Sequence, residues 1–129
     1  MWTHDFVCLS STTSTKTPGP VLSGNLMRAG LGKKSISIFS FADSTELHNE
    51  IMNTFPSLEN GGGYELLRVG EPKGQRNSLI VIPQPREGYT VDYLKEVVRQ
   101  AKVYIRPIQQ DLSMEVHPSI LSEVGDNLH

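Results

Sequence analysis

A change of hydrophobic period in the first half of the chain constrains the fold more than any other feature. Polar and apolar residues alternate in "KKSISIFSF", residues 33–41, as they do along a half-buried β-strand. In the stretch that follows, Leu47, Ile51 and Phe55 recur every four residues, which is typical of one buried face of a helix. The sequence therefore predicts a strand that is followed directly by a helix.

That helix has recognisable ends. Asp43 and Glu46 have the spacing of a capping box, with Asp in place of the more usual Ser or Thr. Pro56 disfavours helical geometry in the residue before it, so the helix should end there. We expect one helix over residues 43–55.

The remaining segments follow the same two patterns. We expect strands at residues 6–9, 64–69, 78–85 and 103–109, and helices at 21–32 and 88–102. The unbroken aliphatic run 79–82 is typical of a central strand that is covered on both faces. Pro107 cannot donate to a ladder, so the last strand should lie at an edge or end there.

This order of elements predicts an α+β domain with two main helices packed on a mixed sheet. The whole series fits a ubiquitin-like β-grasp, in which an N-terminal hairpin precedes the main helix, and we favour it because it uses the strand at 6–9. The long insertion between the first two strands counts against it. Without the first strand, the order is that of a ferredoxin-like fold, which is the alternative.

The domain should span residues 1–112. Within it, residues 10–20 are rich in Ser, Thr and Pro and predict an exposed loop. Residues 113–129 carry few apolar residues in pattern and predict a poorly structured C-terminal tail.

Three consecutive glycines, Gly61–Gly63, raise the question of a phosphate-binding loop. Such a loop follows a strand and opens a helix, so that free N–H groups point at the anion. Here the glycines follow a helix and precede a strand, and no Lys-Ser or Lys-Thr pair comes after them. We interpret them as a turn, because glycine adopts positive φ at no steric cost.

Charge and cysteine content limit the partners and the compartment. The 129 residues carry a net charge of −2 with a pI of about 6.1, whereas nucleic-acid binders usually have a clear positive excess. A lone cysteine, Cys8, agrees with a reducing compartment and resembles a small buried core residue. No secretory signal and no apolar run near ~20 residues is present. We therefore expect a soluble cytoplasmic or nuclear protein that has no membrane partner.

Few residues suggest chemistry. His4 and Cys8 lie four apart, but zinc normally needs three or four protein ligands, and the other histidines are scattered. No serine lies in a G-x-S-x-G elbow. We expect no catalytic residue, no cofactor and no metal, and thus a domain that is not an enzyme.

RNA binding is the alternative function. A ferredoxin-like RNA-recognition domain stacks bases on aromatics of its two central strands, which here would be residues 35–41 and 77–83. The first offers Phe39 and Phe41, but the second has no aromatic residue. We interpret Phe39 and Phe41 as core residues and do not expect nucleic acid as a partner.

A protein partner remains the favoured interpretation. Surface tyrosines and arginines often anchor protein interfaces, and here the candidates are Tyr64, Arg68, Tyr104 and Arg106. Each of them could equally be a half-buried packing residue. The sequence thus predicts a non-catalytic protein-interaction domain whose partner and oligomeric state are not specified.

A resemblance to a known family gives the only indication of the pathway in which the chain acts. "WTHDFVCLSS", "AGLGKK", "FPSLENGGGYELLR" and "GYTVDYLKEVVRQAKVYIRPIQQDL" resemble a segment of large fish proteins that are described as similar to G2/M-phase-specific HECT-type ubiquitin ligases. The resemblance covers most of residues 2–112. It implies a non-catalytic accessory module upstream of a ligase domain. The catalytic cysteine of that family belongs to the HECT domain, so Cys8 inherits no role and no functional residue is carried over.

Overall fold

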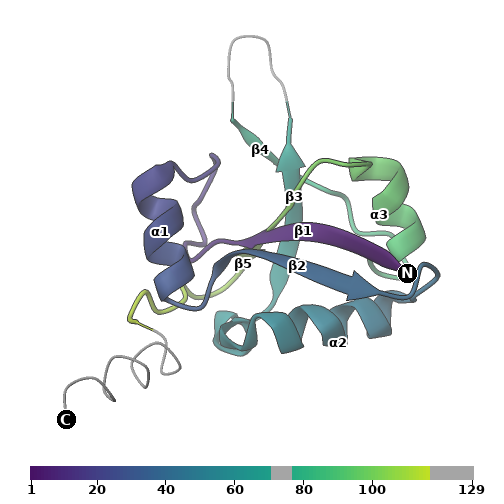
Figure 1. The fold of residues 1–129 in the computed structure, drawn as a ribbon, viewed down its shortest axis with the longest axis horizontal. Helices are drawn as coiled ribbons and strands as arrows, with labels where there is room; N and C mark the ends of the chain where they lie inside the picture. Colours follow the sequence, from purple (N-terminus) through teal and green to yellow (C-terminus); the bar gives the residue numbers. More distant parts are fainter. Residues whose placement is uncertain (71–76, 117–129) are drawn as a thin grey trace.

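The chain forms an α+β domain, as the sequence predicts. A computed structural model describes residues 1–70 and 77–116 (Figure 1). Its elements are, in order, β1 (Trp2–Cys8), α1 (Pro20–Arg28), β2 (Gly32–Ile38), α2 (Ser44–Thr54), the 3-10 helix η1 (Pro56–Gly61), β3 (Tyr64–Val69), β4 (Leu79–Val81), α3 (Val91–Val98) and β5 (Val103–Pro107).

The strands form one mixed sheet in the order β2-β1-β5-β3-β4. β1 is antiparallel to β2 and parallel to β5, and β3 is antiparallel to both β5 and β4. The ferredoxin-like alternative is wrong, because β2 and β4, which would be its central strands, are the two edges of this sheet. The antiparallel β1–β2 pair does precede α2, although α1 is inserted between its strands.

One strand lies elsewhere than predicted, and for another strand one of two predicted alternatives is confirmed. The aliphatic run 79–82 contributes only the three-residue edge strand β4, in which Ile80 and Val81 are 37% and 44% exposed. For β5, the alternative that the strand ends at Pro107 is confirmed, since this residue is the last in the strand, and β5 itself is central in the sheet. The missing N–H therefore falls where the ladder ends.

The first face of the sheet carries the main core, which α2 and α3 cover. The predicted stripe of α2 is confirmed, since Leu47, Ile51 and Phe55 are almost completely buried. The capping box is confirmed as well: the Asp43 carboxylate accepts from the Glu46 N–H at 2.9 Å, and the Glu46 carboxylate accepts from the Asp43 N–H at 3.2 Å. These contacts fix where α2 begins, which positions the groove described below.

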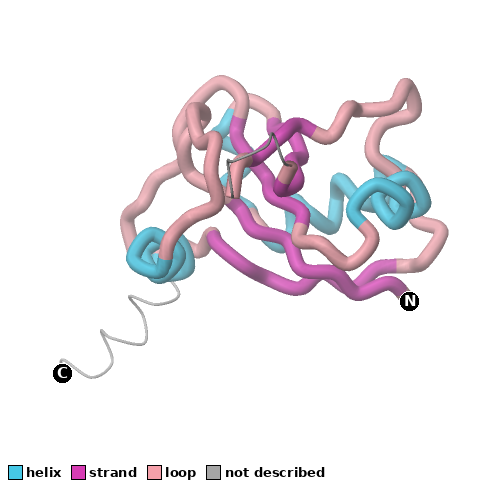
Figure 2. The backbone as a smooth tube through the Cα atoms, turned by 90° about the horizontal axis from the view of Figure 1, so that it is seen from above, coloured by secondary structure: helices cyan, strands magenta, loops and turns pink. Residues whose placement is uncertain are grey.

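The second face of the sheet is covered in part by α1 and by the loop 10–20. In both views α1 lies at one end of the molecule and α3 at the opposite end (Figures 1 and 2). Although the loop has few apolar residues, it is tied to the sheet, because Arg106 donates to the Ser14 carbonyl at 2.6 Å and Leu79 N–H donates to the Thr15 carbonyl at 2.9 Å. Part of its surface is thereby half-buried.

Phe39 and Phe41 are not core residues, contrary to the prediction. They are 68% and 84% exposed. β2 ends at Ile38, and the turn that follows, in which Ala42 N–H donates to the Phe39 carbonyl, carries both rings off the sheet. Lys95 Nζ lies 5.6 Å from the centre of the Phe41 ring. The alternation that suggested a strand therefore continued past the true end of the strand.

The glycine turn and the chain end complete the fold. Gly62 and Gly63 adopt positive φ, 68° and 100°, between η1 and β3, so the interpretation of a turn is confirmed. Leu112 is buried and donates its N–H to the Ser10 carbonyl at 2.8 Å. Residues 113–116 form no helix or strand, and the rest of the predicted tail, 117–129, lies outside the described residues.

Candidate functional site

A groove of about 680 Å³ lies between α2, the start of β3 and the loop 83–89. Its floor is aliphatic: Leu47 and Ile51 come from α2, and Leu58 comes from η1. All three are nearly inaccessible to solvent. A volume of this size lies within the usual range of ligand-binding pockets, roughly 300–1,000 Å³.

A hydrogen-bonded pair of rings forms one wall of the groove. His48 Nδ1 and the Tyr64 hydroxyl are 2.8 Å apart, and the two rings stack with 5.6 Å between their centres. Burial, with a smaller contribution from Tyr89, raises the pKa of the Tyr64 hydroxyl to about 12. The phenol is therefore neutral at physiological pH and can both donate and accept hydrogen bonds.

The loop 83–89 forms the opposite wall, and two tyrosines hold it in place. Tyr89 donates its hydroxyl to the Ile82 carbonyl at 2.7 Å, and Tyr93 of α3 donates to the Pro83 carbonyl at 2.6 Å. Gly88 adopts φ of +86° and lies so close to α2 that a Cβ there would be 2.7 Å from Ser44 Cβ. The width of the groove is thus fixed at the N-terminal end of α2.

The rim of the groove is polar and carries both signs of charge. Gln84, Arg86 and Glu87 come from the loop, and Glu59 comes from η1. All four side chains are exposed. An aliphatic floor below such a rim can bury apolar side chains while hydrogen bonds at the edge orient a ligand.

The structure divides the four predicted binding residues between the two faces of the sheet. The register pairs Glu65 with Arg106 and Leu67 with Tyr104, and side chains alternate along each strand. Tyr64 and Arg68 therefore lie on the first face, and Tyr104 and Arg106 lie on the second. Of the four, Tyr64 alone lines the groove.

Tyr104 and Arg106 make intramolecular contacts. Tyr104 is only 7% exposed. Arg106 Nε donates to the Glu65 carboxylate at 2.9 Å, and its guanidinium also holds the Ser14 carbonyl. Both residues contribute to packing the loop 10–20 and α1 on the sheet, and their part in binding a protein stays a prediction.

Sequence reasoning missed His48 and the loop residues of the groove. His48 follows Leu47 of the helical stripe, so its place beside the buried face could have been inferred. Its pairing with Tyr64 depends on how α2 crosses β3, and no local pattern encodes that crossing. Gly88 offered a weak signal, because a glycine that precedes a helix cap often marks a turn.

Cys8 and His4 have structural roles. Cys8 is fully buried, and desolvation raises the pKa of its thiol to about 12, which confirms the interpretation of a core residue. His4 stacks on Trp2 and lies 2.6 Å from the Ala101 carbonyl through Nε2. Within residues 1–70 and 77–116, no three His, Cys, Asp or Glu side chains gather as a metal site would require.

Residues 1–70 and 77–116 contain no helix with the length and apolar character needed to cross a bilayer.

Comparisons with known proteins give no assignment. No family model matches the sequence, and no curated protein and no solved structure matches it either.

Proposed function

We propose that this chain is a non-catalytic protein-interaction domain that binds a short extended segment of a partner protein in the groove between α2 and the loop 83–89. The observation that carries the proposal is the combination of a buried aliphatic floor with a polar rim in a groove of about 680 Å³. A peptide requires both features, since its side chains need apolar burial and its backbone needs hydrogen bonds.

The rigidity of the frame supports this proposal. One wall belongs to a capped helix, and the other wall is a loop that Tyr89 and Tyr93 hold through carbonyl hydrogen bonds. A preformed site loses little conformational entropy when a ligand binds. The mixed charges of the rim, with Arg86 and Glu87 adjacent, favour a partner segment that carries an acidic and a basic residue on either side of an apolar anchor.

We also propose that the sheet is a ubiquitin-like β-grasp and that the domain serves a ubiquitin-ligase-related protein as an accessory module. The antiparallel β1–β2 pair ahead of α2 supports the first part. The resemblance of the sequence to segments of the fish HECT-type ligase-like proteins supports the proposed role as an accessory module. An intracellular setting, cytoplasmic or nuclear, belongs to the same proposal.

Selection from a random peptide library tests the groove. Thr45 and Asn49 are both exposed on α2, but only Thr45 lines the groove. Peptides selected on the wild-type chain should bind Thr45→Trp at least tenfold more weakly, because the indole fills the groove. They should bind Asn49→Trp with unchanged affinity.

Two outcomes would contradict the proposal. One is a library that yields no peptide above background on the folded chain. The other is a set of selected peptides whose affinity is the same for Thr45→Trp and for the wild-type protein. Far-UV circular dichroism of both variants checks that the fold is intact.

A further inference from the structure

A second cavity, of about 270 Å³, lies on the other face of the sheet, between α1 and strands β1, β2 and β5. Its walls include one leucine and one methionine of α1, three residues of the strands and one lysine that directly precedes β5. These residues are Leu26, Met27, Val7, Lys33, Tyr104 and Lys102.

The sheet register explains why these residues meet. Val7 pairs with Lys33 of β2 and with Tyr104 of β5, so the three side chains lie side by side and point to the same face. Phe6 pairs with Val103, which places Lys102 level with Asp5 and, by alternation, on the same face as Lys33. Two exposed lysines, one on β2 and one directly before β5, thus border one cavity.

Among residues 1–70 and 77–116, no acidic residue lines this cavity. In the described part of the chain, the single ion pair joins Arg106 and Glu65 on neighbouring strands, so neither Lys33 nor Lys102 is paired with a carboxylate there. Asp5, the acid nearest to them by register, accepts a hydrogen bond from Ser35 Oγ at 2.7 Å. Two like charges beside a partly apolar cavity are stabilised when an anion enters between them.

The walls of the cavity add an apolar component and a neutral donor. Leu26 and Val7 are buried and line the inner side, whereas Met27 is 58% exposed and can adapt to a ligand at the mouth. Burial raises the pKa of Tyr104, so its hydroxyl keeps its proton and can donate to an oxygen.

We propose that this cavity binds a small carboxylate that carries a short apolar tail, with Lys33 and Lys102 holding the carboxylate and with Val7, Leu26 and Met27 burying the tail. The cavity is smaller than the roughly 300–1,000 Å³ of drug-sized pockets, so it suits a ligand of few atoms. The site lies on the face of the sheet opposite the groove, and it does not depend on the peptide-binding function.

Titration of the ¹⁵N-labelled chain with hexanoate and with hexanamide at constant ionic strength tests the proposal by NMR. Hexanoate should cause saturable shifts at the amides of Met27, Lys33 and Tyr104, with a dissociation constant on the order of 1 mM. Hexanamide has the same tail without the charge and should bind at least tenfold more weakly. Equal binding of both probes, or shifts that do not saturate, would overturn the proposal.

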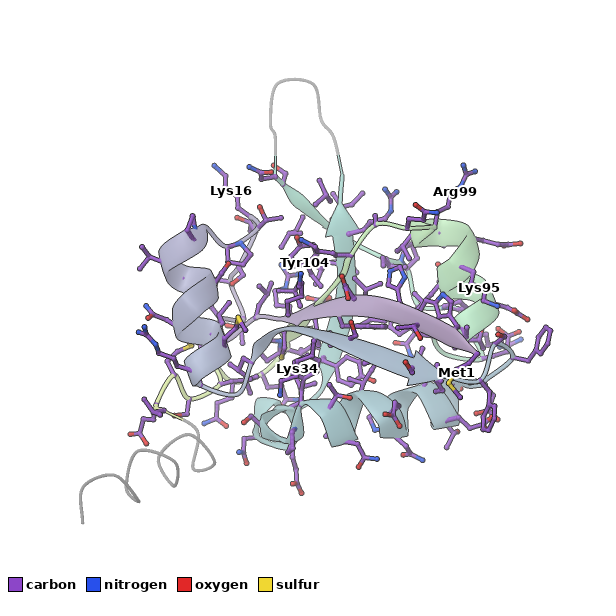
Figure 3. The ribbon with its side chains drawn as sticks, in the orientation of Figure 1. Met1, Lys16, Lys34, Lys95, Arg99 and Tyr104 are labelled. Carbon is purple, nitrogen blue, oxygen red and sulfur yellow. The ribbon has the colours of Figure 1, made fainter. Side chains whose placement is uncertain are left out.

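Charge-removing variants locate the site. The double variant Lys33→Gln, Lys102→Gln should lose hexanoate binding at least tenfold. Arg99→Gln removes an exposed charge at the C-terminal end of α3, away from Tyr104 in Figure 3, and should leave binding unchanged. Unaltered binding in the folded double variant would refute the assignment of the lysines.

Acetyl-Gly-Leu, as the free acid and as the C-terminal amide, identifies the source of the carboxylate. Tighter binding of the free acid than of hexanoate supports a peptide terminus as the ligand, whereas binding of hexanoate alone supports a small molecule. Failure of both acids to bind would contradict the proposal and would leave the groove on the other face untouched.

Discussion

Replacing Gly88 by alanine tests how the groove is held open. Two costs are expected. The first is a backbone cost of roughly 1–2 kcal/mol, because φ at this residue is +86° and an L-residue is strained there. The second arises because the new Cβ would lie 2.7 Å from Ser44 Cβ, and such overpacking costs typically about 1–3 kcal/mol. We expect a total loss of about 2–5 kcal/mol in the free energy of unfolding.

A double-mutant cycle separates these two costs. Ser44→Gly removes the atom that the new methyl group meets, so the overpacking should disappear in the double variant while the backbone strain stays. The coupling energy between the two substitutions should then equal the overpacking cost, about 1–3 kcal/mol, in the restoring direction. Urea unfolding followed by far-UV circular dichroism measures all four proteins, provided that the transition is two-state.

Gly24→Ala is the matched control. Gly24 lies inside α1, and a Cβ there would meet no atom within 4 Å. This substitution should stabilise the chain by about 0.5–1 kcal/mol, because alanine is the better helix former. A loss below about 0.5 kcal/mol for Gly88→Ala, or the absence of coupling with Ser44→Gly, would refute the close approach of loop and helix.

Two other predictions concern the core and its pH dependence. Phe55→Ala removes a fully buried ring and should lower the free energy of unfolding, measured by urea unfolding, by about 3–5 kcal/mol. A loss near 1 kcal/mol would show that α2 is not packed as described. The pKa values of Cys8 and Tyr64 are both raised to about 12 in the folded chain, from 9.0 and 10.0. The unfolded chain therefore releases these protons first, so the contribution of both groups to stability is complete below pH 9 and is lost as the pH rises towards 12. Urea midpoints should fall over that interval, less steeply for Cys8→Ala, and a flat profile would contradict the burial of these groups.

Local signals predicted the best-defined part of the fold. The start of α2 follows from Asp43 and Glu46, its buried face follows from the four-residue repeat, and its end follows from Pro56. Each signal acts within one or two turns of the chain, so it can be interpreted without knowledge of the neighbours. Thr90 is a local signal of the same kind, since its side chain accepts a hydrogen bond from the Tyr93 N–H as the N-cap of α3.

Strand positions could not be predicted in the same way. The aliphatic run 79–82 suggested a central strand, but its place at the edge depends on which strands pair with β3. Phe39 and Phe41 continue an alternating pattern, yet the strand ends before them because the chain turns towards α2. The wall of the groove, where His48 meets Tyr64, forms only once α2 and β3 have packed together.

The parallel pairing of β1 with β5 has a consequence for synthesis of the chain. Phe6 lies beside Val103, so β1, which is translated before the other strands of this sheet, lacks one of its neighbours until nearly the whole domain has been translated. During that interval the backbone N–H and C=O groups on this edge of β1 have no strand to pair with. The final pairing joins segments that are distant in the sequence, which slows folding. A nascent chain that stalls before β5 would therefore leave β1 and β3 without the strand that lies between them in the folded sheet.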